Sequence, residues 1–255
     1  MPWRMRMVWP EAGAEVEPAA IYAADERPSP QGRPWVLTNM IATVDGAAAD
    51  PTGRSGGLGG PADKRVFAAI RAVPDVIVAG SATVIAEDYG PVRLAPELRD
   101  ARRQQGLSEV PRLAVVTTSL RIDPGRRLFA ESAGDRPIVL TTASADPERR
   151  RALSAVAEVV EVGDDRVDWA LALTALRDLA GARIVLSEGG PSTNGQLVAG
   201  DYLDEMCLTV APALVGGPAP RITGGGPGSD LRPLRLARIL TEDGYLFLRY
   251  VRDRT

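Results

Sequence analysis

The sequence contains no histidine and a single cysteine, Cys207. Without histidine, the chain cannot build a Ser-His-Asp or Cys-His catalytic group, and a zinc site made from several cysteine and histidine ligands is excluded as well. One cysteine also excludes a disulfide bond within the chain, which is typical of a protein in a reducing cytosol. Any chemistry carried out by this chain must therefore use other side chains or a bound cofactor, and we expect no metal.

Lysine is almost absent too. Only one of the 30 basic residues is a lysine, Lys64, which leaves 29 arginines. Lys64 follows Asp63, so it does not fit the phosphate-binding motif in which a lysine follows a glycine. The formal net charge of −3 predicts neither nucleic acid nor an anionic membrane as a partner. No apolar run is as long as a membrane helix, and the N-terminus lacks the apolar stretch of a secretory signal, so we expect a cytoplasmic protein.

From about residue 34 onward, short apolar runs of strand type alternate with helical patterns. The runs 75–80, 113–118 and 137–142 are apolar throughout, as expected for strands that are buried on both faces. This alternation predicts an α/β fold with a mainly parallel central sheet flanked by helices on both faces. The pair Asp243-Gly244 between two strand-like runs predicts a C-terminal antiparallel hairpin. We expect one domain over 34–255, preceded by an N-terminal arm, 1–33, to which no fold is assigned.

The ends of the predicted strands are the candidate binding positions, because ligands of open α/β sheets bind beyond the carboxyl ends of the strands. The most informative segment is 184–198, in which a strand meets Gly189 and Gly190 and a helix starts near Ser192. Glycines allow the backbone to approach a pyrophosphate, and a helix N-terminus offers free N–H groups. The alternative is an ordinary turn in which Ser192 or Thr193 caps the helix.

Four other features allow both a functional and a structural interpretation. Glu188 either accepts hydrogen bonds from the N–H edge of a substrate or caps the following helix. Hydroxyls at Thr117 and Thr118 either hold the 2′-phosphate of a dinucleotide or stabilise a turn. Arg71 and Arg93 either bind an anion or are solvated charges. Cys207, in an apolar strand, is a buried structural thiol rather than a nucleophile.

Four motifs in order carry a family resemblance: ATVDG at 42–46, GSATVIAED at 80–88, SEGGPSTNG at 187–195 and LTVAPALVGG at 208–217. With them the chain resembles the reductase domain of bacterial riboflavin biosynthesis, most of all its stand-alone actinobacterial members, over about Trp35 to Val251. The resemblance implies a dihydrofolate-reductase-like fold. It also implies a homodimer, and NADPH-dependent reduction of 5-amino-6-(5-phosphoribosylamino)uracil at the ribosyl imine carbon. Since the chain cannot supply a zinc deaminase, that activity would come from a separate protein.

The resemblance, together with the motifs above, assigns the site residues. The expected catalytic residues are Glu188, which could relay a proton, and Asp45, which matches an Asp-Gly pair beside the cofactor crevice. The expected substrate-binding residues are Asn39, Ser55, Arg71, Arg93 and Glu188. The expected cofactor-binding residues are Ile41, Thr83, Glu87, Thr117, Thr118, Gly189, Gly190, Pro191, Ser192, Thr193, Asn194, Gly195 and Gln196.

Three positions depart from the family pattern. Asn39 stands where many relatives have a lysine, Gly57 stands near the place of an aromatic residue, and Glu87 replaces an aspartate. Glu87 keeps the charge, whereas Asn39 and Gly57 change the substrate pocket. An NADPH-dependent reductase of dihydrofolate or another pterin on the same fold is therefore the first alternative. A non-catalytic NADPH-binding sensor is the second, because a fold alone does not determine function.

Overall fold

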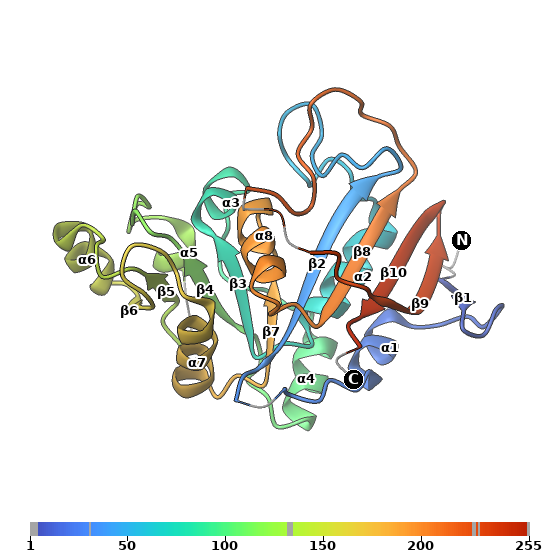
Figure 1. The fold of residues 1–255 in the computed structure, drawn as a ribbon. Coiled ribbons are helices and arrows are strands. Elements are labelled where there is room, and N and C mark those ends of the chain that lie inside the picture. Colours follow the sequence, from blue (N-terminus) through green and yellow to red (C-terminus); the bar gives the residue numbers. More distant parts are fainter. Residues whose placement is uncertain (1–4, 31, 132–134, 226–227, 229, 254–255) are drawn as a thin grey trace.

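The computed structural model describes residues 5–30, 32–131, 135–225, 228 and 230–253. Ten strands form one sheet in the order β1-β9-β10-β8-β2-β7-β3-β4-β5-β6 (Figure 1). The strands are β1 (Arg6–Trp9), β2 (Trp35–Thr43), β3 (Val76–Gly80), β4 (Arg112–Val116), β5 (Ile138–Thr141), β6 (Glu158–Glu161), β7 (Ile184–Ser187), β8 (Glu205–Ala211), β9 (Arg235–Glu242) and β10 (Tyr245–Val251).

Most of this sheet is parallel, as the alternating pattern predicted. Every pairing from β8 through β2, β7, β3, β4 and β5 to β6 is parallel. β10 pairs antiparallel with both β8 and β9, which confirms the C-terminal hairpin. Its turn residues Asp243 and Gly244 have φ values of +52° and +79°, the left-handed conformation that a tight two-residue hairpin turn requires.

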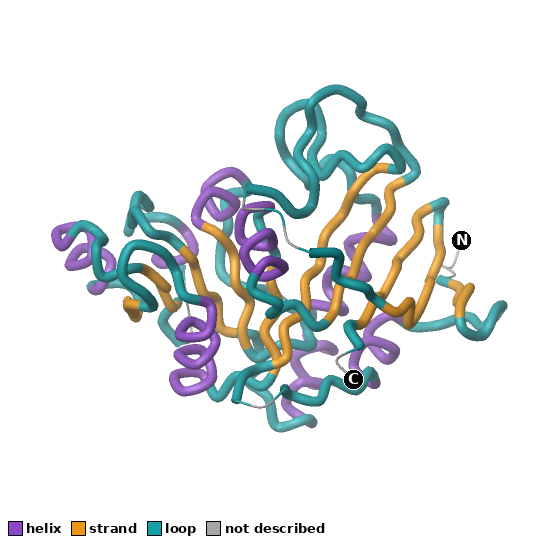
Figure 2. The backbone as a smooth tube through the Cα atoms, viewed as in Figure 1, coloured by secondary structure: helices purple, strands orange, loops and turns teal. Residues whose placement is uncertain are grey.

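Helices cover both faces of the sheet, as Figure 2 shows. Successive residues of a strand point to opposite faces, so Leu37 of β2 enters one core and Val36 the other. The first core also holds apolar side chains of α2 and α6, and the second those of α7 and α8. The helices are α1 (Pro18–Ala24), α2 (Pro61–Arg71), α3 (Ser81–Ala86), α4 (Pro96–Gln104), α5 (Arg127–Ala130), α6 (Pro147–Ser154), α7 (Trp169–Ala180) and α8 (Pro191–Ala199).

The N-terminal segment corrects the expectation of an arm over residues 1–33. β1 pairs antiparallel with β9, and Met5 and Tyr22 are buried in the first core. α1 packs against α2. The segment is therefore part of the domain, because its few large apolar side chains fill the core beside α2. The proline-rich composition concealed the α1 helix, which starts with Pro18 in its first turn. Residues 1–4 and 31 lie outside the described part.

A buried cluster of charged side chains joins this segment to β8. Glu205 accepts hydrogen bonds from Arg27 Nε at 2.9 Å and from Arg249 Nε at 2.8 Å. Burial raises the pKa of the Glu205 carboxyl, but the attraction of Arg27 and the hydrogen bond from Arg249 outweigh this effect and lower it to about 2. Cys207, two residues along β8, is buried, as expected for a structural thiol. Because β8 lies between β2 and β10, this strand belongs to the core and is not a free edge.

Candidate active site

A cavity of about 410 Å³ lies beside the second half of β2 and the carboxyl end of β7. Its lining residues come from five parts of the chain, one of which is the loop between β2 and α2 with Ser55, Gly56 and Gly59. β2 contributes Asn39, Met40 and Ile41; the α2 helix contributes Asp63, Lys64, Phe67 and Arg71; α3 and the loop that follows it contribute Thr83, Glu87 and Tyr89; and Glu188 follows β7. The cavity is at the end of the sheet where ligands of open α/β folds bind.

One wall of the cavity is built around Glu188. The Arg71 guanidinium donates two parallel hydrogen bonds to its carboxylate, Nε to Oε1 and Nη2 to Oε2, both at 2.7 Å. The Tyr89 hydroxyl donates a third, to Oε2 at 2.8 Å. The Glu188 side chain is only 3% exposed, and Arg71 also lies 4.3 Å from the centre of the Phe67 ring. Paired forks of this kind fix both side chains, so Glu188 and Arg71 form a single preorganised unit.

The pKa values in this wall follow from its burial. Desolvation raises the pKa of the Tyr89 hydroxyl well above its usual value, and the negative charge of Glu188 raises it further. Desolvation alone would lower the pKa of Arg71, but the Glu188 carboxylate outweighs it and raises the value. Tyr89 therefore stays a neutral donor and Arg71 a cation at neutral pH.

Ser55 and Glu87 meet on another side of the cavity. The backbone N–H and the hydroxyl of Ser55 donate to Glu87 Oε1 at 3.0 and 3.1 Å. Ser55, which is expected to bind the substrate, is thereby joined to Glu87, which is expected to bind the cofactor. Together with Asn39, Ile41, Thr83, Arg71 and Glu188, they are the predicted residues that the structure brings to this cavity.

Glycines allow the ends of β3 and β7 to approach each other closely. The Gly80 N–H donates to the Gly189 carbonyl at 2.7 Å. A Cβ atom on Gly190 would lie 2.6 Å from the Thr83 hydroxyl, and one on Gly80 would lie 2.8 Å from the Thr193 hydroxyl. These distances are too short for a side chain. A side chain at either position would therefore force Thr83 or Thr193 to move, and glycine lets the segments before α3 and α8 pack together as they are.

The N-terminus of α8 tests one part of the structural interpretation of this segment, the capping of the helix. The helix starts at Pro191 with Gly190 as the N-cap residue, and no side chain caps it. Neither Ser192 nor Thr193 occupies the cap position, so the expectation that one of them caps the helix is wrong. The free N–H groups of the first turn remain available for a negatively charged ligand.

Several side chains expected to bind the cofactor make hydrogen bonds within the scaffold. Buried Asn194 accepts from the Ser187 hydroxyl at 2.9 Å and donates to the Ile222 carbonyl at 3.1 Å. Gln196 accepts from the Trp169 indole at 3.1 Å, and a Cβ on Gly195 would lie 2.3 Å from the Gly224 carbonyl oxygen. Thr117 accepts from the Leu120 N–H at 3.1 Å, which is turn chemistry. Thr118, one residue further, is exposed.

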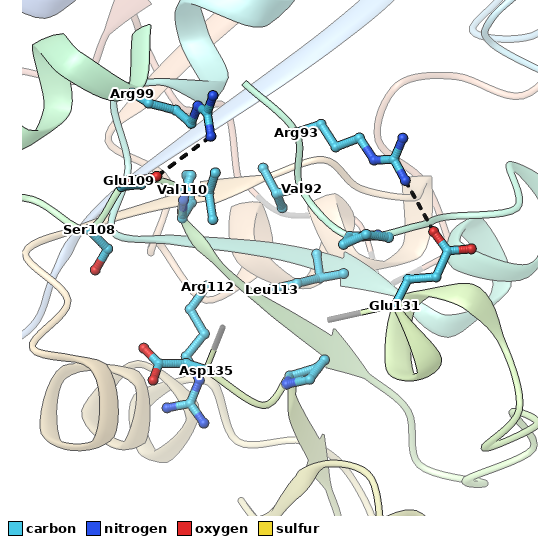
Figure 3. A pocket seen from close by; sticks show the side chains of 13 residues that line it. Val92, Arg93, Arg99, Ser108, Glu109, Val110, Arg112, Leu113, Glu131 and Asp135 are labelled. Atoms are coloured by element: carbon cyan, nitrogen blue, oxygen red, sulfur yellow. Dashed lines mark hydrogen bonds and ion pairs between the residues drawn. The ribbon is translucent and has the colours of Figure 1, made fainter. Parts of the chain in front are cut away.

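Arg93 lies outside the cavity described above. It lines a second cavity of about 670 Å³ near the start of β4 (Figure 3). There it points to Glu131, with Arg93 Nη2 3.2 Å from Glu131 Oε2, and Arg99 pairs with Glu109 at 3.6 Å (Figure 3). Arg112, the third arginine of its lining, pairs with Glu158, so the arginines of this second cavity have acidic partners and it is not a strongly positive anion site. The two arginines that the sequence grouped as substrate ligands therefore stand in different places.

Asp45 also lies outside the cavity lining. It is exposed at the base of two loops, 44–60 and 212–221, which rise together beyond the sheet (Figure 1). Its carboxylate accepts from the Thr43 hydroxyl and from the N–H groups of Val215 and Gly216, at 3.2 and 2.7 Å. The hydrogen bond from Thr43, followed by that from Gly216, lowers the pKa of Asp45. Asp45 joins the two loops, and this position gives it no contact with the cavity.

The sequence missed several residues of the cavity, above all those on α2. Lys64, Phe67 and Arg71 stand at spacings of three and four residues and so share one face of the helix. That periodicity is visible in the sequence, but the motifs assign only Arg71 to the site. Asp63 and Tyr89 carried no motif at all.

The described residues contain neither a cluster of metal ligands nor a helix that could cross a membrane. Within the described ranges, no three or more cysteine, aspartate or glutamate side chains come together as metal ligands. No helix in that part of the chain has the length and apolar character needed to cross a bilayer.

Comparisons with known proteins agree with this architecture. Residues 34–244 match the family model described as the RibD C-terminal domain. The chain belongs to this family. A reductase of Methanothermobacter thermautotrophicus is 35% identical over 199 residues, covering 78% of this chain and 87% of its own length. A reductase of Archaeoglobus fulgidus is 30% identical over 185 residues, covering 72% and 83%. Both are named 2,5-diamino-6-ribosylamino-4(3H)-pyrimidinone 5′-phosphate reductase.

A solved structure gives the same result for the fold. A pyrimidine reductase-like protein of Corynebacterium diphtheriae superposes with a TM-score of 0.82 at 26% identity, covering 94% of this chain and 100% of its own. The expected family and fold class, a mainly parallel α/β sheet with antiparallel C-terminal strands, are both confirmed.

Proposed function

We propose that this member of the RibD C-terminal domain family reduces a 6-(5-phosphoribosylamino)pyrimidine with NADPH. The uncapped N-terminus of α8, which follows Gly189-Gly190 and neighbours the cavity wall at Glu188, carries the proposal. A helix N-terminus approached by glycines suits a pyrophosphate, and the adjoining cavity suits a small heterocycle. The names of the two archaeal relatives supply the class of substrate.

The chain's own residues bind and orient two ligands. The nicotinamide would supply the hydride for the imine carbon of the substrate, and a water molecule would supply the proton for the amine nitrogen. The first turn of α8 would hold the pyrophosphate, and Thr83 and Ile41 would lie beside the rest of the cofactor. Glu188 already accepts three hydrogen bonds, so we assign it the positioning of Arg71 and Tyr89 at the cavity wall rather than the donation of a proton. Asp45 is assigned the joining of the two loops.

NADPH is proposed over NADH because exposed polar groups follow β4, the neighbour of β3. Thr118 and Arg121 are both exposed there, where a hydroxyl and a guanidinium suit a 2′-phosphate. We further propose a homodimer in the cytoplasm, with any deaminase activity supplied by a separate protein.

The substrate phosphate is assigned to Lys64. Lys64 and Arg71 are the basic side chains that line the cavity, and the Arg71 fork is already bound to Glu188. We expect Lys64→Gln to raise KM for a phosphorylated substrate by about 10- to 100-fold, because a hydrogen bond to a charged group contributes roughly 1.5–3 kcal/mol. KM for the dephosphorylated analogue should not change. Steady-state kinetics with both compounds measure this difference, and an equal loss on both would remove the assignment.

A pterin reductase remains the second candidate function, for one structural reason. Of the two arginines expected to hold the phosphate, one is committed to Glu188 and the other lines a different cavity. A pterin without phosphate would need neither.

The deciding experiment follows NADPH absorbance with the phosphoribosylamino-pyrimidines and with dihydrofolate in parallel, each with an NADH control. We expect turnover of a phosphoribosylamino-pyrimidine with NADPH. Turnover of dihydrofolate alone would replace the proposal with the pterin function. NADPH binding without turnover of any of these compounds would favour the sensor.

A further inference from the structure

Among the described residues, four carboxyl side chains line the cavity, and three of them have hydrogen-bond or ion-pair partners. Glu188 binds Arg71 and Tyr89, and Glu87 accepts two hydrogen bonds from Ser55. Asp88 forms an ion pair with Arg126 at 3.1 Å. Asp63 is the fourth, and its surroundings differ.

Asp63 is half-buried in the first turn of α2. Within the described part of the chain, no arginine or lysine nitrogen lies within ion-pair distance of its carboxylate. Burial raises its pKa, and this effect exceeds the opposing effects of a hydrogen bond from the Thr209 hydroxyl and of the Lys64 charge. A carboxylate has about four acceptor positions, and the Thr209 hydroxyl takes one of those of Asp63, which lines the cavity. A ligand that brings N–H donors into the cavity would satisfy it.

Pyrimidines differ in the hydrogen-bond donors that they can present to the Asp63 carboxylate. A 2-amino-4-oxopyrimidine has two adjacent donors, the N3–H and the 2-amino group, which match the two oxygens of one carboxylate. A uracil has a carbonyl oxygen at C2 in place of the amino group, and this oxygen faces a carboxylate unfavourably. We propose that Asp63 determines specificity by binding the N3–H and 2-amino edge, so that the heterocycle reduced here is a 2-amino-4-oxopyrimidine rather than a uracil.

This proposal rests on the proposed function and narrows its substrate. It favours the 2,5-diamino compound in the names of the archaeal relatives over the uracil expected from the sequence. It also orders the chemistry: the amino group at C2 must still be present at reduction, so a hydrolytic deamination at C2 would act on the product of this enzyme.

The first test measures binding of two bases that differ only at C2, 2,5,6-triaminopyrimidin-4-one and 5,6-diaminouracil, by calorimetry. We expect the wild-type protein to bind the triamino base at least 10-fold more tightly. Asp63→Asn preserves the shape of the side chain but replaces an acceptor oxygen with a donor. It should weaken binding of the triamino base by about 10- to 100-fold and remove the preference. Asp100→Asn, at an exposed carboxylate of α4, is the matched control and should bind as wild type.

Equal binding of the two bases by the wild type, a preference for the uracil, no binding of either base, or an unchanged preference in Asp63→Asn would each overturn the proposal. Thermal unfolding of Asp63→Asn checks that the variant is folded, and Asp63→Ser provides a smaller neutral replacement if it is not. Turnover of the two phosphoribosyl compounds separates this proposal from the proposed function. Faster reduction of the uracil form would leave the function intact and remove the role of Asp63. Failure to reduce either form, with the binding preference retained, would remove the proposed function and leave the role of Asp63 in binding intact.

Discussion

Replacing Glu188 with glutamine is expected to lower kcat/KM by about 10- to 100-fold and to reduce the free energy of unfolding by about 2–3 kcal/mol. The substitution keeps the size of the side chain but removes the charge that holds the Arg71 fork. The Arg71 side chain is only 20% exposed, so its cation would be left largely buried without a partner. The guanidinium would then move toward water or into the cavity, and the wall that positions the heterocycle would be lost. Steady-state kinetics and urea unfolding measure the two effects.

A double-mutant cycle measures the interaction between Arg71 and Glu188 separately from the effect of losing each side chain. Arg71→Gln alone should be as damaging as Glu188→Gln, and the double variant should lose less than the sum of both, because neither partner is then left unpaired. Arg71→Lys keeps the charge but loses the paired geometry, so it should recover only part of the activity. Strict additivity of the two single losses would show that Arg71 and Glu188 do not act as a unit.

The second large effect concerns the buried cluster at β8. Glu205→Gln is expected to lower the free energy of unfolding by about 3–5 kcal/mol, since it leaves Arg27 and Arg249 buried with one carboxylate fewer. Folded domains are stable by only about 5–15 kcal/mol, so the variant should unfold at a clearly lower temperature. Asp100→Asn, which breaks an exposed ion pair with Arg103, should change stability by less than about 1 kcal/mol. Comparable losses in the two variants would contradict this role for Glu205.

The same cluster predicts how stability depends on pH. The pKa of Glu205 is about 2 in the folded protein and 4.5 in its ordinary state, so the folded protein holds this proton less tightly than the unfolded chain. The stabilisation is therefore complete above pH 4.5 and is lost as the pH falls from 4.5 toward 2. Urea midpoints measured across this range should fall more steeply for the wild type than for Glu205→Gln.

Local patterns were sufficient to predict most of the sheet. The continuously apolar runs became β3, β4 and β5, and Asp243-Gly244 formed the predicted turn. Each of these depends on neighbouring residues alone. β1 and α1 were missed because their apolar side chains are few, and only the core beside α2 shows why they are buried.

The candidate site also has features that local sequence predicts and features that depend on residues far apart in the chain. Backbone features such as Gly189-Gly190 before a helix can be recognised in one short segment, and the structure places them between Glu188, which lines the cavity, and α8. The outcome for Arg93 depends on the path of the loop after α3, which directs it to Glu131. Asp63 became a candidate only once the ion pairs of the other cavity carboxylates were known, because its distinguishing feature is the lack of such a partner.

The packing of α1 against α2 has a practical consequence for fragments of this protein. α2 presents Lys64 and Arg71 to the cavity and Val66 and Ile70 to the core beside Tyr22. The family match begins at residue 34, but a recombinant fragment that starts there would lack the layer behind this helix and the Arg27 partner of Glu205. The shortest active fragment should therefore begin upstream of Met5. A shorter one would expose an apolar face of the very helix that shapes the substrate cavity, and it should aggregate before its activity could be assayed.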